Sequence, residues 1–214
     1  MRERNSSFQN VNLFITAISR RGSSGAGFTV GLSDGSSFFV SSSFCHQFQL
    51  EINQSADQDL LEMLEVESDS IKALQKAGEL IARAEQSSGG LYIKLKKKGF
   101  SDIACSSAVE SVVDAGLLDD ERFAQFWIAS RLRKHPEGRT MLYKGLVTRG
   151  VKPEKAKSAI RSSVSEEDLQ KAVLKAGKKL SVKYGQSDQK LRQALYRRGF
   201  SSEEITYYFD SSDI

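Results

Sequence analysis

The 214-residue sequence predicts a mainly α-helical protein: three tandem three-helix repeats in an elongated or curved array, preceded by a small N-terminal β-hairpin or β-sheet module. Two observations predict this fold. The hydrophobic pattern changes from a period of two to a period near 3.6 at about residue 68, as expected where strands give way to helices. A ten-residue pattern then recurs whose ninth residue is Gly99, Gly150 or Gly199, with spacings of 51 and 49 residues, which is typical of repeated structural units.

Residues 1–66 are expected to form the β module. Between residues 27 and 41, apolar side chains alternate with small or polar ones on both sides of Asp34-Gly35, which predicts a hairpin. An Asp-Gly pair supplies the positive φ angles that a tight primed turn needs. Residues 11–21 predict a further strand, and a glycine-rich link should join it to the hairpin. About three strands would make a small sheet. The apolar residues of the hairpin that should share one face are Phe28, Val30, Leu32, Phe38 and Val40.

The three repeats are predicted at residues 67–116, 117–164 and 165–214. Each contains the pattern Leu-x3-Leu-x2-(Lys or Arg)-Gly followed by Phe or Val. The two leucines form one apolar edge of a short helix, and the glycine one position past its end takes the left-handed conformation that closes it. Basic residues in the last turn complement the helix dipole. A new helix with a Ser cap or an early Pro then begins after each glycine.

A further helix is expected before the Leu-x3-Leu element of each repeat. In the first repeat it should cover residues 71–83, with Leu74 and Ala77 in its buried stripe. In the second it begins at "DDERFAQFWIASRLR", and in the third at "SEEDLQKAVLKAGKKL". Ser165 and Asp168 fit a variant of the capping box at the start of that third helix. Its buried stripe should contain Leu169, Val173, Ala176 and Leu180.

Charge is distributed unevenly along the chain. Residues 1–66 hold four Arg, no Lys and seven Asp or Glu, a net charge of −3. Because the whole chain has a net charge of +4, the remaining residues carry +7. A basic portion of this kind suggests an anionic partner such as nucleic acid, but a net charge of this size also fits an ordinary solvated helical surface. No apolar run approaches the ~20 residues that a membrane span needs, and the charged start is not followed by a secretory segment. A cytoplasmic protein without a membrane partner is therefore expected, with both cysteines reduced.

The segment from Gly116 to Arg131, flanked by the three glycine-terminated patterns, resembles the RecX family. Members of this family carry a Leu-(Asp/Asn)-Asp-x-Arg-Phe-Ala signature that opens the second repeat. The residues that match the signature here are Leu118, Asp119, Asp120, Arg122, Phe123 and Ala124. The resemblance covers roughly residues 70–210, and the β segment is similar to an extension found in some members. The chain departs from the family pattern at Gly89-Gly90, where members have a polar helix start.

The resemblance implies a regulatory function. RecX proteins bind RecA and its nucleoprotein filament on DNA, lie along the deep groove of the filament, and alter strand exchange and ATP turnover, usually by inhibition. It follows that the partners would be RecA and, weakly and without sequence preference, DNA, and that the chain would act as a monomer in recombination, repair and the SOS response. No enzymatic activity and no cofactor are implied.

Basic residues recur near the equivalent helix of each repeat. At a repeat period they would line up along one side of a stacked array, where a stripe could follow a phosphate backbone or an acidic groove. Scattered solvated charges are the alternative. The residues predicted to form this basic stripe are Lys94, Lys96, Lys97, Lys98, Arg131, Arg133, Lys134, Arg139, Lys144, Arg149, Lys152, Arg192, Arg197 and Arg198.

Catalytic and metal sites are not supported by the residue patterns. The pair Asp119-Asp120 precedes a helix, so an N-cap explains it better than a catalytic site does. Phe123, Phe126 and Trp127 have the spacing of a packed helix face rather than a base-stacking platform. Cys45-His46 lacks the further ligands of a zinc site, and "GSSGAG" lacks the Lys-Ser/Thr ending of a phosphate loop. The chain is therefore expected not to be an enzyme and to hold no metal.

Two other functions remain open at this point. A stand-alone helical DNA-binding module would insert a short helix of each repeat into a groove, as helix-turn-helix proteins do. Salt-sensitive binding that differs between DNA sequences would favour that alternative. A nuclease would need several converging carboxylates, for which the sequence offers caps instead.

Overall fold

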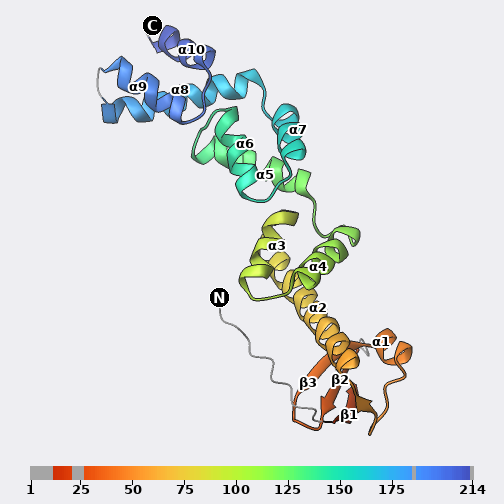
Figure 1. The fold of residues 1–214 in the computed structure, drawn as a ribbon. Coiled ribbons are helices and arrows are strands. Elements are labelled where there is room, and N and C mark those ends of the chain that lie inside the picture. The colour runs from red at the N-terminus through yellow and green to blue at the C-terminus, as the bar shows by residue number, and fades with distance from the viewer. Residues whose placement is uncertain (1–11, 21–26, 185–186, 213–214) are drawn as a thin grey trace. The chain divides into compact units, whose positions relative to one another are not determined.

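A four-stranded antiparallel sheet begins the fold. The computed structural model describes residues 12–20, 27–184 and 187–212, and the chain forms two compact units, Met1–Glu79 with Leu95–Val112 and Leu80–Lys94 with Val113–Ile214. The sheet, of which Figure 1 labels β1, β2 and β3, lies in the first unit and has the order β3-β2-β1-β4. Its strands are β1 (Leu13–Arg20), β2 (Gly27–Leu32), β3 (Ser37–Ser41) and the two-residue β4 (Ser55–Ala56). The predicted module is thus confirmed, with β4 in addition to the expected strands.

The hairpin between β2 and β3 is confirmed, but the predicted primed turn is wrong. Four residues connect the strands. A primed turn of this kind needs positive φ at both Asp34 and Gly35, but only Gly35 of the two has it, at +86°. The Asp34 carboxylate instead accepts hydrogen bonds from the Ser36 hydroxyl and from the Ser36 backbone N–H at 2.9 Å. These bonds lower the pKa of Asp34 and hold it in an ordinary turn conformation. Most of the predicted glycine-rich link, residues 21–26, lies outside the described residues.

The helix that follows the sheet is longer than predicted. After the short α1 (Ser42–Gln47), α2 runs from Gln58 to Arg83, so it begins well before residue 71, and position 66 lies inside it. Leu60 and Leu64 pack against the apolar face of the sheet. The buried face of α2 continues from these leucines to Ala73 and Ala77, which leaves Leu74 41% exposed. The predicted stripe is therefore right for Ala77 and wrong for Leu74.

Helices make up the rest of the described chain, which confirms a mainly α protein with an N-terminal β module. Three of them, α3 (Ser88–Lys97), α6 (Arg139–Thr148) and α9 (Asp188–Arg197), contain the Leu-x3-Leu pattern. Gly99, Gly150 and Gly199 follow them with φ of +95°, +84° and +83°, as predicted. The number of repeats and the elongated shape stay predictions. The other helices are α4 (Asp102–Asp114), α5 (Asp120–Lys134), α7 (Pro153–Ser163), α8 (Glu166–Tyr184) and α10 (Ser202–Ser212).

The predicted capping residues occupy helix starts. Ser101 Oγ accepts from Ala104 N at 3.2 Å before α4, and Pro153 is the first residue of α7. Before α8, Ser165 Oγ accepts from Asp168 N at 3.1 Å, while the Asp168 carboxylate accepts from Ser165 N at 3.0 Å. The capping box is therefore confirmed, and the hydrogen bonds from Ser165 lower the pKa of Asp168.

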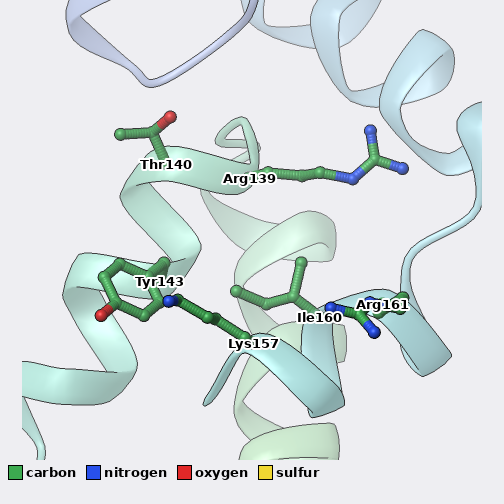
Figure 2. A pocket seen from close by; sticks show the side chains of 6 residues that line it. All are labelled: Arg139, Thr140, Tyr143, Lys157, Ile160 and Arg161. Atoms are coloured by element: carbon green, nitrogen blue, oxygen red, sulfur yellow. The ribbon is translucent and has the colours of Figure 1, made fainter. Parts of the chain in front are cut away.

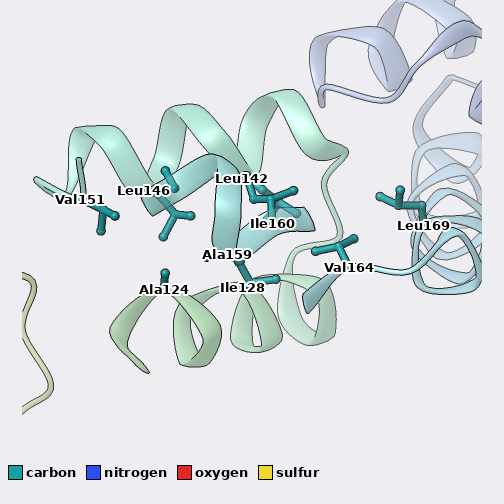
Figure 3. Close-up of a cluster of buried hydrophobic side chains, with 10 residues drawn as sticks. Ala124, Ile128, Leu142, Leu146, Val151, Ala159, Ile160, Val164 and Leu169 are labelled. Carbon is teal, nitrogen blue, oxygen red and sulfur yellow. The ribbon is translucent and has the colours of Figure 1, made fainter. Parts of the chain in front are cut away.

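Two apolar clusters stabilise the helices of the second unit. In the first, Leu142 and Leu146 of α6 pack with Ala124 and Ile128 of α5 and with Ile160 of α7 (Figure 3). In the second, the leucines of α9 pack with α8 and α10. All four residues of the predicted α8 stripe are buried, in one cluster or the other. Both leucines of the repeated pattern therefore face the interior, as predicted.

Residues at corresponding positions, Ser87 and Gly138, each donate a hydrogen bond to a backbone carbonyl of the following helix group in the second unit. Ser87, just before α3, donates a hydrogen bond through its hydroxyl to the carbonyl of Arg149. Gly138, just before α6, donates through its N–H to the carbonyl of Arg198 at 3.0 Å. In each case the acceptor immediately precedes a positive-φ glycine, and we call these two contacts the glycine junctions.

Glycine is required at these junctions because the backbones approach closely. A Cβ on Gly150 would lie 2.5 Å from the backbone atoms of Gly89 and Gly90, and a Cβ on Gly138 would overlap the Gly199 backbone. The departure from the family pattern at Gly89-Gly90 thus has a physical reason. A side chain at either position would collide with the backbone of the turn after α6, at Arg149 and Gly150.

Candidate functional site

The two carboxylates at the start of α5 have different roles. Asp119 is its N-cap: Oδ1 accepts from Glu121 N at 2.8 Å and Arg122 N at 3.1 Å. The backbone hydrogen bond from Arg122 is the main cause that lowers the pKa of Asp119. The N-cap prediction is therefore confirmed for Asp119.

The cap prediction is wrong for Asp120. This side chain is 3% exposed, and its Oδ1 accepts from Ser88 N at 2.7 Å, while Lys155 Nζ lies 3.9 Å from Oδ2. Its carboxylate therefore holds the start of α3 against the start of α5. Asp120 is the first residue of α5, directly after the N-cap, and its side chain faces the start of α3, where Ser88 N has no partner within its own helix.

The other signature residues also stabilise the fold. Leu118 and Ala124 are buried, and Phe123 packs against the first apolar cluster. Arg122 donates from Nε to Glu85 Oε1 at 2.8 Å and from Nη2 to the Leu117 carbonyl at 3.4 Å. The contact with Glu85 ties α5 to the segment before α3, and the contact with Leu117 holds the segment that leads into α5.

The aromatic residues of α5 do not all pack in the interior. Trp127 contacts the core, and Arg131 and Arg149 lie over its ring with centroid distances of 5.6 and 4.7 Å. Gly145 lies so close to the Trp127 side chain that a Cβ there would overlap it. Phe126 is 66% exposed, so the prediction that it packs is wrong. The buried face of α5 passes through Ala124 and Ile128, and Phe126 lies away from it.

Half of the fourteen residues predicted for the basic stripe have local partners. Arg131 pairs with Glu137, Lys96 Nζ lies 2.9 Å from Asp102 Oδ1, and Arg139 Nη2 lies 2.9 Å from Glu166 Oε1. Such partners orient a cation and reduce its availability to an external anion. The seven residues and their local contacts are Lys94 with Gln86, Lys96 with Asp102, Arg131 with Glu137, Arg139 with Glu166, Arg149 with Gly145, Arg192 with Phe209 and Arg197 with Gln193.

The remaining predicted cations are mostly exposed. Arg198 is half-buried in the turn after α9. Alignment of the predicted residues along one side of the chain stays a prediction. The exposed residues are Lys97, Lys98, Arg133, Lys134, Lys144 and Lys152.

A hollow between α6 and α7 brings cations and apolar side chains together, and we call it the α6–α7 groove. It encloses about 450 Å³ and is lined by Arg139, Thr140, Tyr143, Lys157, Ile160 and Arg161 (Figure 2). The prediction from sequence included Arg139 alone of these residues. Lys157 and Arg161 are four residues apart on one helix, a spacing that places both on one face and could have pointed to them.

Arg139 lies where the groove meets α8 and α10. Besides Glu166, its guanidinium approaches Glu204 Oε1 at 3.6 Å. Burial raises the pKa of the Glu204 carboxyl. The backbone hydrogen bond from Ser201 and the charge of Arg139 act in the opposite direction and partly offset this rise in pKa. Two carboxylates therefore orient Arg139 and partly neutralise its charge. Arg139 is consequently less available to an anionic ligand in the groove.

A second hollow of about 580 Å³ lies between α9 and α10. Arg192, Tyr196 and Arg197 line it from α9, and Ile205 and Thr206 are among the residues that line it from α10. Arg192 and Thr206 follow Tyr143 and Lys157 of the α6–α7 groove by 49 residues, the spacing of Gly150 and Gly199. The two hollows therefore occupy corresponding pairs of helices and share a cationic lining.

Comparisons with known proteins agree on one family. No family model matches the chain. A protein of Prosthecochloris aestuarii named "Regulatory protein RecX" is 34% identical over 144 residues, which cover 67% of this chain and 95% of the relative. A protein of Bacillus velezensis with the same name is 26% identical over 208 residues, covering 94% of this chain and 78% of the relative.

Solved structures show the same fold. A crystal structure described as regulatory protein RecX superposes with a TM-score of 0.71 at 18% sequence identity and covers 92% of this chain and 99% of its own. RecX from Lactobacillus salivarius superposes with a TM-score of 0.59, also at 18% identity, over 68% of this chain and 97% of its own. The helices among the described residues include none with the combination of length and apolar composition that a membrane span requires.

Proposed function

The chain belongs to the RecX family of regulatory proteins, and from this we propose that it binds the RecA recombinase and its nucleoprotein filament and inhibits strand exchange and ATP turnover. The proposal rests on the 34% identity to a RecX protein that the chain covers almost end to end, at 95%. It places the protein in the cytoplasm, as a monomer acting in DNA recombination, repair and the SOS response. Binding to DNA itself is proposed to be weak and independent of sequence.

The arrangement of helices in the second unit supports a partner with a repeating surface. The glycine junctions join successive helix groups through hydrogen bonds from corresponding positions to the carbonyl before a glycine, so similar surfaces recur along the chain. Exposed cations lie in the middle of α6, at Lys144, and in the turn that follows α6, at Lys152. We propose that the exposed members of the basic stripe contact acidic surface of RecA or the enclosed DNA, and that the protein modulates RecA by binding rather than by catalysis.

A RecA activity assay with the purified full chain tests the proposal. Single-stranded DNA-dependent ATP hydrolysis and strand exchange should both fall as the protein approaches a stoichiometric ratio to RecA. No effect on either activity at that ratio would contradict the proposed function.

Charge reversal tests the contribution of the stripe. Lys97→Glu with Lys98→Glu changes two exposed residues, whereas Lys96 is left in its ion pair with Asp102. This variant should inhibit RecA less than the parent at equal helicity, because like charges repel across an interface. Lys178→Glu with Lys179→Glu makes the same charge change at exposed positions of α8 outside the stripe and should inhibit as the parent does. Equal inhibition by the parent and both variants would exclude Lys97 and Lys98 from the contact.

A further inference from the structure

The α6–α7 groove has an apolar floor and a cationic rim. Ile160 is 6% exposed and belongs to the first apolar cluster, so the floor is a fixed part of the core. Lys157 and Arg161 extend from α7 on either side of Ile160 (Figure 2). Thr140 and Tyr143 add hydroxyl groups from α6. A ligand that fills this hollow would therefore place an apolar group on Ile160 and negative groups beside the rim.

The rim charge is not neutralised on the α7 side. Within the part of the chain that the structure describes, neither Lys157 nor Arg161 forms an ion pair with a carboxylate, and both are exposed. None of the six lining residues is acidic. Arg139, at the other rim, already has Glu166 and Glu204 as partners. Among the described residues, the groove consequently offers two positive charges that no carboxylate neutralises, one turn apart, next to apolar surface.

The aromatic ring in the groove does not provide a platform for nucleic-acid bases. Lys157 Nζ lies over the Tyr143 ring, 6.0 Å from its centroid, so this face already has a cation on it. Tyr143 also packs against the first apolar cluster. Base stacking needs an open aromatic face, which makes an extended single strand a poorer fit than a peptide. An apolar side chain flanked by carboxylates satisfies both the floor and the rim.

We propose that the α6–α7 groove binds an acidic peptide segment of a partner protein, with an apolar side chain of the segment on Ile160 and its carboxylates at Lys157 and Arg161. The inference deepens the proposed function, on which it rests for the identity of the partner.

The test measures peptide binding to the full chain without RecA, so that it can fail independently of the proposed function. The probe is a short fluorescein-labelled peptide of Glu and Leu, compared by fluorescence anisotropy with a peptide in which every Leu is replaced by Ser. Lys157→Glu with Arg161→Glu should weaken binding of the Glu-Leu peptide by about tenfold or more, as for reversal of paired charge contacts. Lys178→Glu with Lys179→Glu, matched in charge, should leave the affinity within about twofold.

The control peptide and an oligonucleotide separate the alternatives. The Glu-Ser peptide should bind about tenfold more weakly than the Glu-Leu peptide, because it cannot cover the apolar floor. Equal binding of the two peptides, unchanged binding by the Lys157 and Arg161 variant, or no binding of the Glu-Leu peptide would each overturn the proposal. If that variant loses affinity for oligothymidine while keeping its affinity for the peptide, the groove is a nucleic-acid site and the proposal is wrong. Circular dichroism checks that each variant is folded.

Discussion

Gly99 and Gly150 both have positive φ after a ten-residue helix, but their surroundings differ. A Cβ on Gly99 would meet nothing within 4 Å, whereas one on Gly150 would lie 2.5 Å from the backbone at Gly89 and Gly90. The two positions therefore separate the cost of backbone conformation from the cost of the junction. At Gly99 only the left-handed conformation requires glycine, and at Gly150 the packing requires it as well.

Replacement by alanine should distinguish these costs. Gly99→Ala should lower the free energy of unfolding by about 1 kcal/mol, the penalty of positive φ for a residue with Cβ. Gly150→Ala should lower it by about 3 kcal/mol or more, because two backbone segments must also separate. Urea denaturation followed by circular dichroism measures both. Equal losses would mean that the glycine junction contributes nothing to stability.

The N-cap of α5 makes stability depend on pH. Asp119→Ala should cost about 1 kcal/mol at neutral pH, while Asp119→Asn should cost little, because Asn also caps helices well. The folded-state pKa of Asp119 lies below its ordinary value of 3.8, so the extra stability of the carboxylate is fully present above that value and is lost as the pH falls through the lowered pKa. Urea denaturation at a series of pH values should show a smaller acid-induced loss for the Asn variant. Parallel losses in both proteins would rule out this contribution.

Between elements, buried polar contacts fix how the helices of the second unit meet. The Asp120 carboxylate accepts from the first N–H of α3 and faces Lys155 of α7. Trp127 of α5 lies against Gly145 of α6, under the guanidinium of Arg149. Each contact joins two or more helices, so its loss should affect their packing more than their helicity.

Asp120 provides the sharpest test at this scale. Asp120→Ala leaves Ser88 N without its partner and should lower the free energy of unfolding by about 2 kcal/mol. Asp120→Asn keeps an amide oxygen that can accept from Ser88 N, so its loss should be smaller. Tryptophan fluorescence during urea denaturation reports on the α5 environment directly. An alanine variant as stable as the parent would show that the contact is dispensable.

Sequence patterns predicted the helices better than the contacts between them. Caps such as Asp119 and the Ser165-Asp168 box depend on residues close in the chain, so they were predictable. The start of α2 was missed because burial of Leu60 and Leu64 depends on the sheet, which lies elsewhere in the sequence. The role of Asp120 and the α6–α7 groove depend on segments brought together by folding. Phe126 was misassigned because aromatic spacing alone does not say which helix face is buried.

At the scale of the whole molecule, the chain combines a mildly acidic β module with a basic helical portion. Residues 1–66 carry a net charge of −3 and the remainder +7. A net positive charge attracts both DNA and acidic protein surfaces, so charge by itself does not identify the partner. Membership of the RecX family points to the RecA filament as the partner. The proposed function is therefore tested by comparing binding to the filament with binding to naked DNA.

Co-sedimentation of the full chain with RecA filaments on single-stranded DNA makes this comparison most directly, with the same DNA lacking RecA as the control. The proposed function predicts saturable binding to the filaments near a stoichiometric ratio, at a salt concentration where little protein sediments with DNA alone. Sedimentation that is the same with and without RecA would contradict it.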